Sequence, residues 1–377
     1  MASVQHDLNL APITSSALRL QESQELEDPR WDAFLASIPG VNYPQSSLWA
    51  RGKAHLGYRI KRMTVLRSDT IIGGAQMMIR PSRILGNFGF VPLGPVLTSG
   101  NHGIAEVILD RLHTIASEEG IRYLIVQPPG GAQGMVPILQ SRGFQPAPLE
   151  LSPSSTVLVH LSPDVESLFM RFRRQTRHNI RISERRGVEV RQGTEADLST
   201  AHRLLSTTGQ RHGYSPYSLE YLRHLWSLLA PAGCMKLFLA EVQGEAVSAL
   251  FLITFGETAT EWRIGWSGLH SRCYPNEAIH WAAIQWAATH GYNIYDLGGI
   301  PPRVMAQVSS SSTSGNRSDL QGYMFKLGFG GEIERSPRPY AYLPNPLLRF
   351  IHHAVPNDCS ESRSMGFCMN WMLSRLR

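Results

Sequence analysis

The sequence predicts an α+β protein built from two copies of one mixed-sheet domain. A strand–turn–strand pattern occurs twice, and each occurrence is followed by a helix that ends at a glycine and then by another strand. The 377 residues, of which 42% are hydrophobic, also exceed what a single core usually uses. We expect a first domain over 1–151, completed by 336–377, and a second domain over 152–335.

The two strand pairs lie at 60–80 and 235–255. They read IKRMTVLRSDTIIGGAQMMIR and MKLFLAEVQGEAVSALFLITF, each an apolar strand, a short polar turn and a second strand. Apolar residues then recur at helical spacing over 103–120 and 275–291. Because matching features are offset by roughly 170 residues, the pattern indicates a duplicated unit.

A basic helix is expected between the two copies. Ser162-Pro163 has the form of a helix start and Gly187 that of an end, with Phe169 and Phe172 facing the core. The segment holds seven arginines: Arg171, Arg173, Arg174, Arg177, Arg181, Arg185 and Arg186. This cluster favours a polyanionic partner, and a solvated helix face is the alternative.

Composition and short motifs limit the cellular compartment and the cofactors that we expect for this protein. Four cysteines without C-x-x-C or zinc spacing suit a reducing cytosol, and no signal peptide or apolar stretch of ~20 residues is present. We therefore expect a cytoplasmic protein. No P-loop, nicotinamide or flavin fingerprint occurs, so no metal or cofactor is expected. Residues 309–318, SSSSTSGNRS, are expected to form a loop without fixed structure before a strand at YMFKLGFGG.

Five segments, in the same order, resemble the FemABX family. They are PQSSLWARGKAHLG (44–57), FVPLGPVL (90–97), QTRHNIRISERRGVEV (175–190), YPNEAIHWAAIQWAATHGYNIYDLGG (274–299) and GYMFKLGFGGE (322–332). The long helical hairpin of some members is absent, so the smaller FemX-like members are the closer comparison. The chain departs from the family pattern at Leu93 and at Leu97-Thr98. The change at Leu93, where the family often has an arginine, puts in doubt one contact with a phosphate or with the donor. The change at Leu97-Thr98, where an acidic residue often follows in the family, puts in doubt any catalytic base from the first half.

The resemblance implies two GNAT-like domains in tandem, the fold of acyl-CoA N-acyltransferases. It implies aminoacyl-tRNA as donor and, as acceptor, an amine on the stem peptide of a nucleotide- or lipid-linked peptidoglycan precursor. Some relatives instead add one amino acid to a peptide antibiotic, and the sequence leaves that alternative open. We expect the chain to act as a monomer.

The resemblance also implies the catalytic residues. Lys326 would stabilise the oxyanion formed at the ester, with Phe325 beside it. Strand alternation would put these two side chains on opposite faces. A surface lysine on an edge strand is the alternative. Asp296 is a candidate because of its position at the end of a strand, beside two glycines, rather than because of the resemblance. It would accept a proton from the amine or orient it, or it would simply cap the turn before Gly298-Gly299.

Further candidates would bind the substrates. Lys53 and Arg211 match basic positions that bind precursor phosphates in the family, and Tyr214 and Tyr217 would stack on a base or sugar. Two more candidates for substrate binding lie in the C-terminal blocks, Asn276 and Tyr323. Candidate tRNA contacts are Arg174, Arg177, Arg181 and Arg185.

Two rival classes remain. An acyl-CoA N-acyltransferase would need a glycine-rich pyrophosphate loop, which SRCYPNEAIHW (271–281) lacks and which Gly100–Ala105 keeps only in part. A non-catalytic member would have lost Lys326 or Phe325, and both are present. The C-terminal tail mixes apolar residues with arginines, which suits peripheral membrane contact or packing on the first half.

Overall fold

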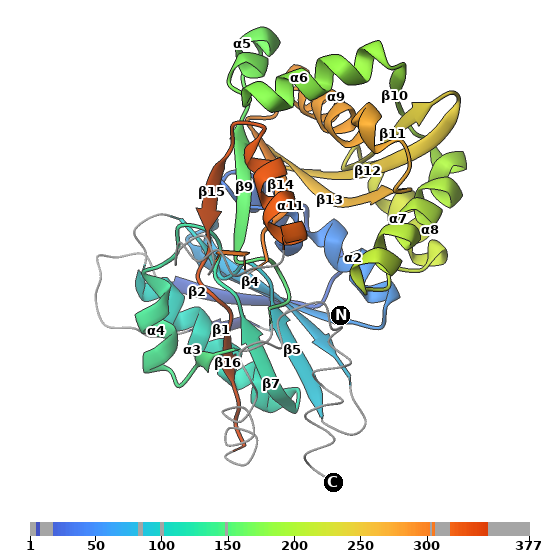
Figure 1. The fold of residues 1–377 in the computed structure, drawn as a ribbon. Helices are drawn as coiled ribbons and strands as arrows, with labels where there is room; N and C mark the ends of the chain where they lie inside the picture. Colours follow the sequence, from blue (N-terminus) through green and yellow to red (C-terminus); the bar gives the residue numbers. More distant parts are fainter. Residues whose placement is uncertain are drawn as a thin grey trace. The chain divides into compact units, whose positions relative to one another are not determined.

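The computed structural model describes residues 5–7, 18–81, 86–98, 102–147, 150–301, 304–305 and 317–345. The chain forms two compact units (Figure 1). Unit 1 comprises 1–154 and 335–377, and unit 2 comprises 155–334.

Unit 1 is a nine-stranded mixed sheet with helices on it. Its strands are β1 (Gln5–Asp7), β2 (Leu18–Ser23), β3 (Arg59–Arg67), β4 (Thr70–Arg80), β5 (Asn87–Val91), β6 (Val96–Leu97), β7 (Ile121–Val126), β8 (Gln145–Pro146) and β16 (Tyr340–Tyr342). The strand order is β1-β2-β3-β4-β5-β7-β16-β8, with β6 paired to β4. Strands β5 and β7 run parallel. The helices are α1 (Pro29–Ala36), η1 (Tyr43–Gln45), α2 (Ser47–His55), α3 (His102–Glu118) and α4 (Met135–Ser141).

The core of unit 1 lies mainly between α3 and the sheet. Ile108, Leu112 and Ile115 of α3 are fully buried in one cluster with Met77 and Leu124 of the strands. Their spacing of three and four residues is the helical period that the sequence showed.

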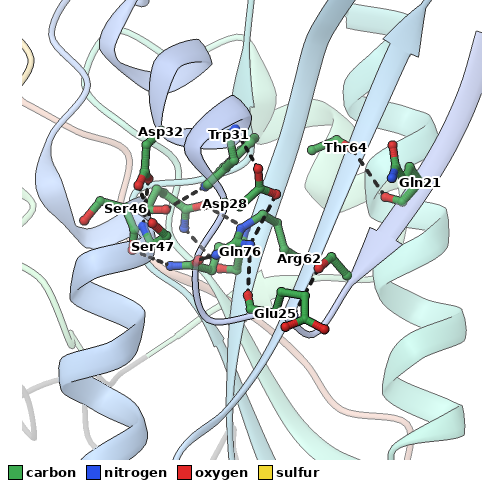
Figure 2. A network of polar contacts seen from close by, with 12 residues as sticks. Gln21, Glu25, Asp28, Trp31, Asp32, Ser46, Ser47, Arg62, Thr64 and Gln76 are labelled. Carbon is green, nitrogen blue, oxygen red and sulfur yellow. Dashed lines mark hydrogen bonds and ion pairs between the residues drawn. The ribbon is translucent and has the colours of Figure 1, made fainter. Parts of the chain in front are cut away.

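A buried polar network ties the segment around α1 and α2 to strands β3 and β4 (Figure 2). The Gln45 amide donates to the Gln76 carbonyl at 3.2 Å and accepts from the Gln76 amide N–H at 2.7 Å. The Arg62 guanidinium, only 1% exposed, donates to the Gln76 side-chain oxygen at 2.6 Å, to the Glu25 carbonyl at 3.1 Å and to Asp28 at 3.3 Å. These bonds satisfy polar groups that would otherwise be costly to bury.

Unit 2 is a seven-stranded mixed sheet. Its strands are β9 (Ser155–His160), β10 (Val188–Gln192), β11 (Met235–Val242), β12 (Glu245–Phe255), β13 (Thr258–Trp266), β14 (Ile294–Gly299) and β15 (Glu332–Arg335), in the order β10-β11-β12-β13-β14-β9-β15. The helices are α5 (Val165–Met170), α6 (Arg174–Arg185), η2 (Glu195–Asp197), α7 (Leu198–His212), α8 (Leu219–Leu229), η3 (Ser271–Cys273), α9 (Pro275–Thr289) and α11 (Arg317–Leu327).

Helices cover both faces of this sheet. Ile279 and Ile284 of α9 share a core cluster with Phe238, Leu250 and Leu252, which lie on one face of β11 and β12. On the other face α7 lies against β13, so closely that a Cβ on Gly265 would be 2.4 Å from the Leu205 nitrogen. Strand β12 is therefore buried on both sides and reads as a continuous apolar run.

Both predicted hairpins are confirmed. Strands β3 and β4 pair antiparallel, as do β11 and β12. Both predicted glycine helix ends are also present: Gly120 and Gly291, with φ of 60° and 83°, follow α3 and α9. A positive φ is readily adopted by glycine because it has no Cβ.

The basic helix predicted between the copies is wrong in its start and its continuity. Asp164, not Ser162, caps α5, because its carboxylate accepts from the Glu166 and Ser167 amides at 3.1 and 3.2 Å. The helix also breaks before α6, where the Arg173 amide donates to the Gly328 carbonyl at 2.8 Å. This long-range bond replaces the local helical one. Phe172 is buried as expected, and Phe169 packs against the core while partly exposed.

The strand predicted around YMFKLGFGG is also wrong, because residues up to Leu327 belong to helix α11. Leu320, Tyr323 and Leu327 pack on the core of unit 2 at helical spacing. Residues 306–316, with most of the expected loop, and the tail from 346 onward lie outside the described residues.

Candidate functional site

The candidate site lies where two parallel strands of unit 2 stop pairing. Strand β13 pairs with β14 through Thr258–Ile294, Ala259–Tyr295 and Thr260–Asp296. Beyond Asp296, β14 continues beside β9 with an irregularity before Gly299. Backbone groups that leave a regular ladder at such a point are free to meet side chains or ligands.

Lys326 reaches this strand end from the last turn of α11. Its ammonium donates to the Gly299 carbonyl at 2.9 Å, and the side chain is partly exposed. Phe325 packs elsewhere, with its ring 5.2 Å from the His280 ring and 5.3 Å from the Phe329 ring. The two side chains diverge because successive helical residues are rotated by about 100°, which replaces the strand alternation we expected.

Asp296 is buried at the same strand end. Its Oδ1 atom accepts the Thr156 hydroxyl and, at 2.8 Å, the Gly298 amide, so the turn-capping role considered from the sequence is present. Burial raises the pKa of the Asp296 carboxyl, while its hydrogen bonds and Lys326 act in the opposite direction. The structure thus brings Lys326, Phe325 and Asp296 into one region of unit 2.

Two residues at this site were missed from the sequence, Glu261 of β13 and His280 of α9. The Glu261 Oε2 atom lies 3.5 Å from the His280 Nε2 atom. Burial raises the pKa of Glu261 to about 7, opposed by Lys326, and lowers the pKa of His280 to about 3. His280 is therefore neutral near pH 7, and the contact is not an ion pair. A glutamate within the otherwise largely apolar strand TATEWRIGW was the available signal for Glu261.

In unit 2, two of the residues proposed to bind a phosphate or to stack on a base, Arg211 and Tyr217, lie against aromatic rings. The Arg211 guanidinium lies 4.7 Å from the Trp266 ring and donates to the Trp266 carbonyl at 2.6 Å. Tyr217 stacks on Trp262 at 5.9 Å, and burial raises the pKa of Tyr214. Arg211 is exposed, so it keeps a surface on which an anion can bind.

The other substrate candidates differ in accessibility. In unit 1, Lys53 of α2 is partly exposed, with its ammonium 4.9 Å from the Trp49 ring. Asn276, near the start of α9, accepts the Ser248 hydroxyl at 2.8 Å. Tyr323 is 8% exposed and lies in the core cluster of unit 2, so it packs rather than presenting its ring at the surface.

The candidate tRNA contacts fall into two kinds. Arg174, Arg181 and Arg185 are exposed on α6. Arg177 is half-buried and donates to the Met170 carbonyl at 2.8 Å and to the Phe172 carbonyl. It thereby satisfies carbonyls at the end of α5, which a helix leaves without partners.

Among the described residues no group of three or more His, Cys, Asp or Glu could hold a metal ion. Cys234 and Cys273 are free thiols, whereas Cys359 and Cys368 lie outside the described part. No helix within the described ranges is long and apolar enough to cross a membrane.

Comparisons with known proteins agree with this fold. Residues 170–303 match the acetyltransferase (GNAT) domain. The lipid II:glycine glycyltransferase of Staphylococcus saprophyticus is 24% identical over 237 residues, covering 60% of this chain and 57% of that protein. The chain thus matches little more than half the length of this relative.

Solved structures with the same fold cover a larger share of the chain. FemX aligns with a TM-score of 0.73 at 19% identity, covering 85% of this chain and 97% of FemX. A tandem GNAT protein from the clavulanic acid biosynthesis pathway aligns with a TM-score of 0.54 at 11% identity, covering 87% and 99%.

The two mixed sheets with flanking helices therefore form a tandem GNAT fold, which confirms the predicted fold class. Within that class, the chain is similar in sequence to the lipid II:glycine glycyltransferases, and the predicted resemblance to FemABX proteins is confirmed.

Proposed function

We propose that this protein is an aminoacyltransferase that moves an amino acid from aminoacyl-tRNA to an amine of a peptidoglycan precursor stem peptide. The observation that carries the proposal is the Lys326 ammonium fixed by the Gly299 carbonyl beside two buried carboxyl groups. The names of the relatives support a lipid-linked acceptor. A charged-tRNA donor places the reaction in the cytoplasm.

The chemistry is aminolysis of an ester. The amine lone pair attacks the ester carbonyl carbon, a C–N bond forms, and the carbonyl oxygen becomes an oxyanion. The C–O bond to the tRNA ribose then breaks, the nitrogen loses one proton, and the leaving oxygen takes up a proton in its place. An ammonium has three N–H donors, and the Gly299 contact orients Lys326 while leaving donors for that oxyanion.

The test is transfer of radiolabel from a mixed pool of aminoacylated tRNA. Parallel reactions contain a UDP-linked muropeptide, a lipid-linked precursor, an amine intermediate of a peptide antibiotic, or no acceptor. Acetyl-CoA serves as the alternative donor. We expect label to move only from tRNA, and the productive acceptor separates cell-wall synthesis from antibiotic synthesis. Transfer from acetyl-CoA alone would refute the tRNA donor.

The exposed arginines of α6 should contribute to tRNA affinity. Replacing Arg174, Arg181 and Arg185 together by glutamine is expected to raise KM for charged tRNA. The triple substitution should also reduce the slope of the logarithm of the tRNA binding constant against the logarithm of the salt concentration. The reduction should be up to about one for each arginine that contacts a phosphate. The value of kcat should change little, because these side chains lie on the surface of α6.

Arg177→Gln is the matched comparison on the same helix. Because Arg177 bonds to two carbonyls near the end of α5, its loss should lower the melting temperature and leave the salt slope nearly unchanged. If the triple variant keeps the wild-type salt dependence, α6 does not contact tRNA.

A further inference from the structure

Glu261 presents a buried carboxylate oxygen, Oε2, that has no hydrogen-bond partner among the residues that the structure describes. The same holds, within the described part of the chain, for the Nδ1 atom of His280. Leaving such groups unpaired in a folded protein is costly, so each case calls for an explanation. Asp296 differs, because its Oδ1 atom already accepts two hydrogen bonds.

A β-bulge in β13 places Glu261 on the face of the sheet that carries His280. Leu252 pairs with Glu261 and Phe251 with Arg263, which leaves Trp262 as the extra residue of β13. Paired residues share a face of the sheet, so Glu261 lies with Leu252 on the face covered by α9. Arg263 is exposed, 5.8 Å from the Tyr217 ring. Without the bulge, strand alternation would put Glu261 and Arg263 on one face.

The groups around Glu261 set its charge. Lys326 comes from α11, Asp296 and Tyr295 from β14, His280 from α9, and Arg263 from β13 itself. Burial is the largest influence and raises the pKa of Glu261 to about 7. Lys326 and Arg263 act to lower it, and Asp296 acts to raise it. His280 does not exchange a proton in this range, because its pKa lies at about 3.

We propose that Glu261 is the proton acceptor of this site and that Asp296 holds the end of β14. The inference rests on the proposed aminoacyl transfer. An acceptor amine of the lysine kind arrives as an ammonium, which has no lone pair for attack. One N–H bond breaks, its electron pair stays on nitrogen, and the proton binds Glu261 Oε2. The neutral amine then attacks the ester held by Lys326, and Glu261 later returns the proton to solvent.

Glu261→Gln keeps the shape of the side chain and removes proton uptake. We expect kcat at pH 7 to fall by ~10²–10³-fold, with KM for charged tRNA little changed. In the wild type, kcat/KM should rise with pH through about 7, and the variant should lack this rise. Glu261→Asp, which keeps a carboxylate, should recover part of the rate. Glu189→Gln, on the exposed surface of β10, should behave like the wild type.

Folding is checked separately. Since the pKa of Glu261 is raised in the folded state, its ionisation destabilises the fold as pH rises through about 7. Glu261→Gln removes that loss, so its melting temperature at a pH above this range should equal or exceed that of the wild type.

A readout without substrate comes from carbon-13 NMR of glutamate-labelled protein. One carboxyl resonance should titrate near pH 7 and be missing in Glu261→Gln. A midpoint at the ordinary value of about 4.3 would overturn the proposal. So would a Glu261→Gln enzyme with wild-type rate and pH profile, while the aminoacyl transfer itself would stand. If the wild type transfers no aminoacyl group, the proposed function fails, and this role fails with it.

Discussion

Lys326→Met is expected to lower kcat for amide formation by ~10²–10³-fold while KM for both substrates changes little. The methionine keeps a chain of similar length against α11 and β14 but removes the charge that would meet the oxyanion. The contact with the Gly299 carbonyl is also lost. Steady-state kinetics with one charged tRNA and the productive acceptor measure the effect.

The charge change has a second expected consequence. The Lys326 ammonium lowers the pKa of both Glu261 and Asp296, so its removal should raise both pKa values further. The two carboxyl groups would then be protonated at higher pH, which limits the loss of folding stability. A circular dichroism melt should therefore show a folded protein.

Lys236→Met is the matched control. This lysine lies on β11 with its ammonium 5.6 Å from the Trp286 ring, and it takes no part in the candidate site. Its replacement should leave kcat unchanged. Wild-type kcat in Lys326→Met would exclude an oxyanion role for Lys326 and leave it as a structural lysine.

Arg62→Met should cost unit 1 about 3–5 kcal/mol of unfolding free energy. The Arg62 side chain is 1% exposed and supplies donors to Gln76, Glu25 and Asp28 (Figure 2). Methionine fills part of the volume but leaves the Gln76 side-chain oxygen and the Asp28 carboxylate short of a buried donor. Urea unfolding followed by circular dichroism measures the change.

Arg67→Met provides the comparison on the same strand, since Arg67 is exposed at the end of β3. It should change the free energy of unfolding by less than about 0.5 kcal/mol. Equal stability of the two variants would show that the network around Arg62 is not required for the fold of unit 1.

Local patterns in the sequence predicted the hairpins and the helix ends well. Both strand pairs are set by short-range signals: alternating or continuous apolar runs on either side of a two-residue polar turn. Gly120 and Gly291 follow their helices for the same local reason, because a positive φ favours glycine.

Errors arose where a contact distant in sequence decided the structure. The segment before Leu327 became a helix because its apolar residues at helical spacing pack on the core of unit 2. The basic helix was split where the Arg173 amide bonds to Gly328, far along the chain. Tertiary packing routinely overrides local propensity in this way.

By itself, the sequence determined the duplicated α+β architecture and the order of most strands and helices. It also proposed Lys326, Phe325 and Asp296 as site residues, and their roles stay a prediction. These depend on periodicity, turn residues and a family resemblance, all of which are written along the chain. Only the tertiary structure decided that Arg177 donates to a carbonyl at the end of α5 and that Tyr323 is buried. It also decided that Glu261 lies beside His280. The physical reason is that burial, and the pKa shift it causes, depend on which elements pack together. In addition, the bulge at Trp262 puts Glu261 and Arg263 on different faces of the sheet, and no pattern in the sequence marks this bulge.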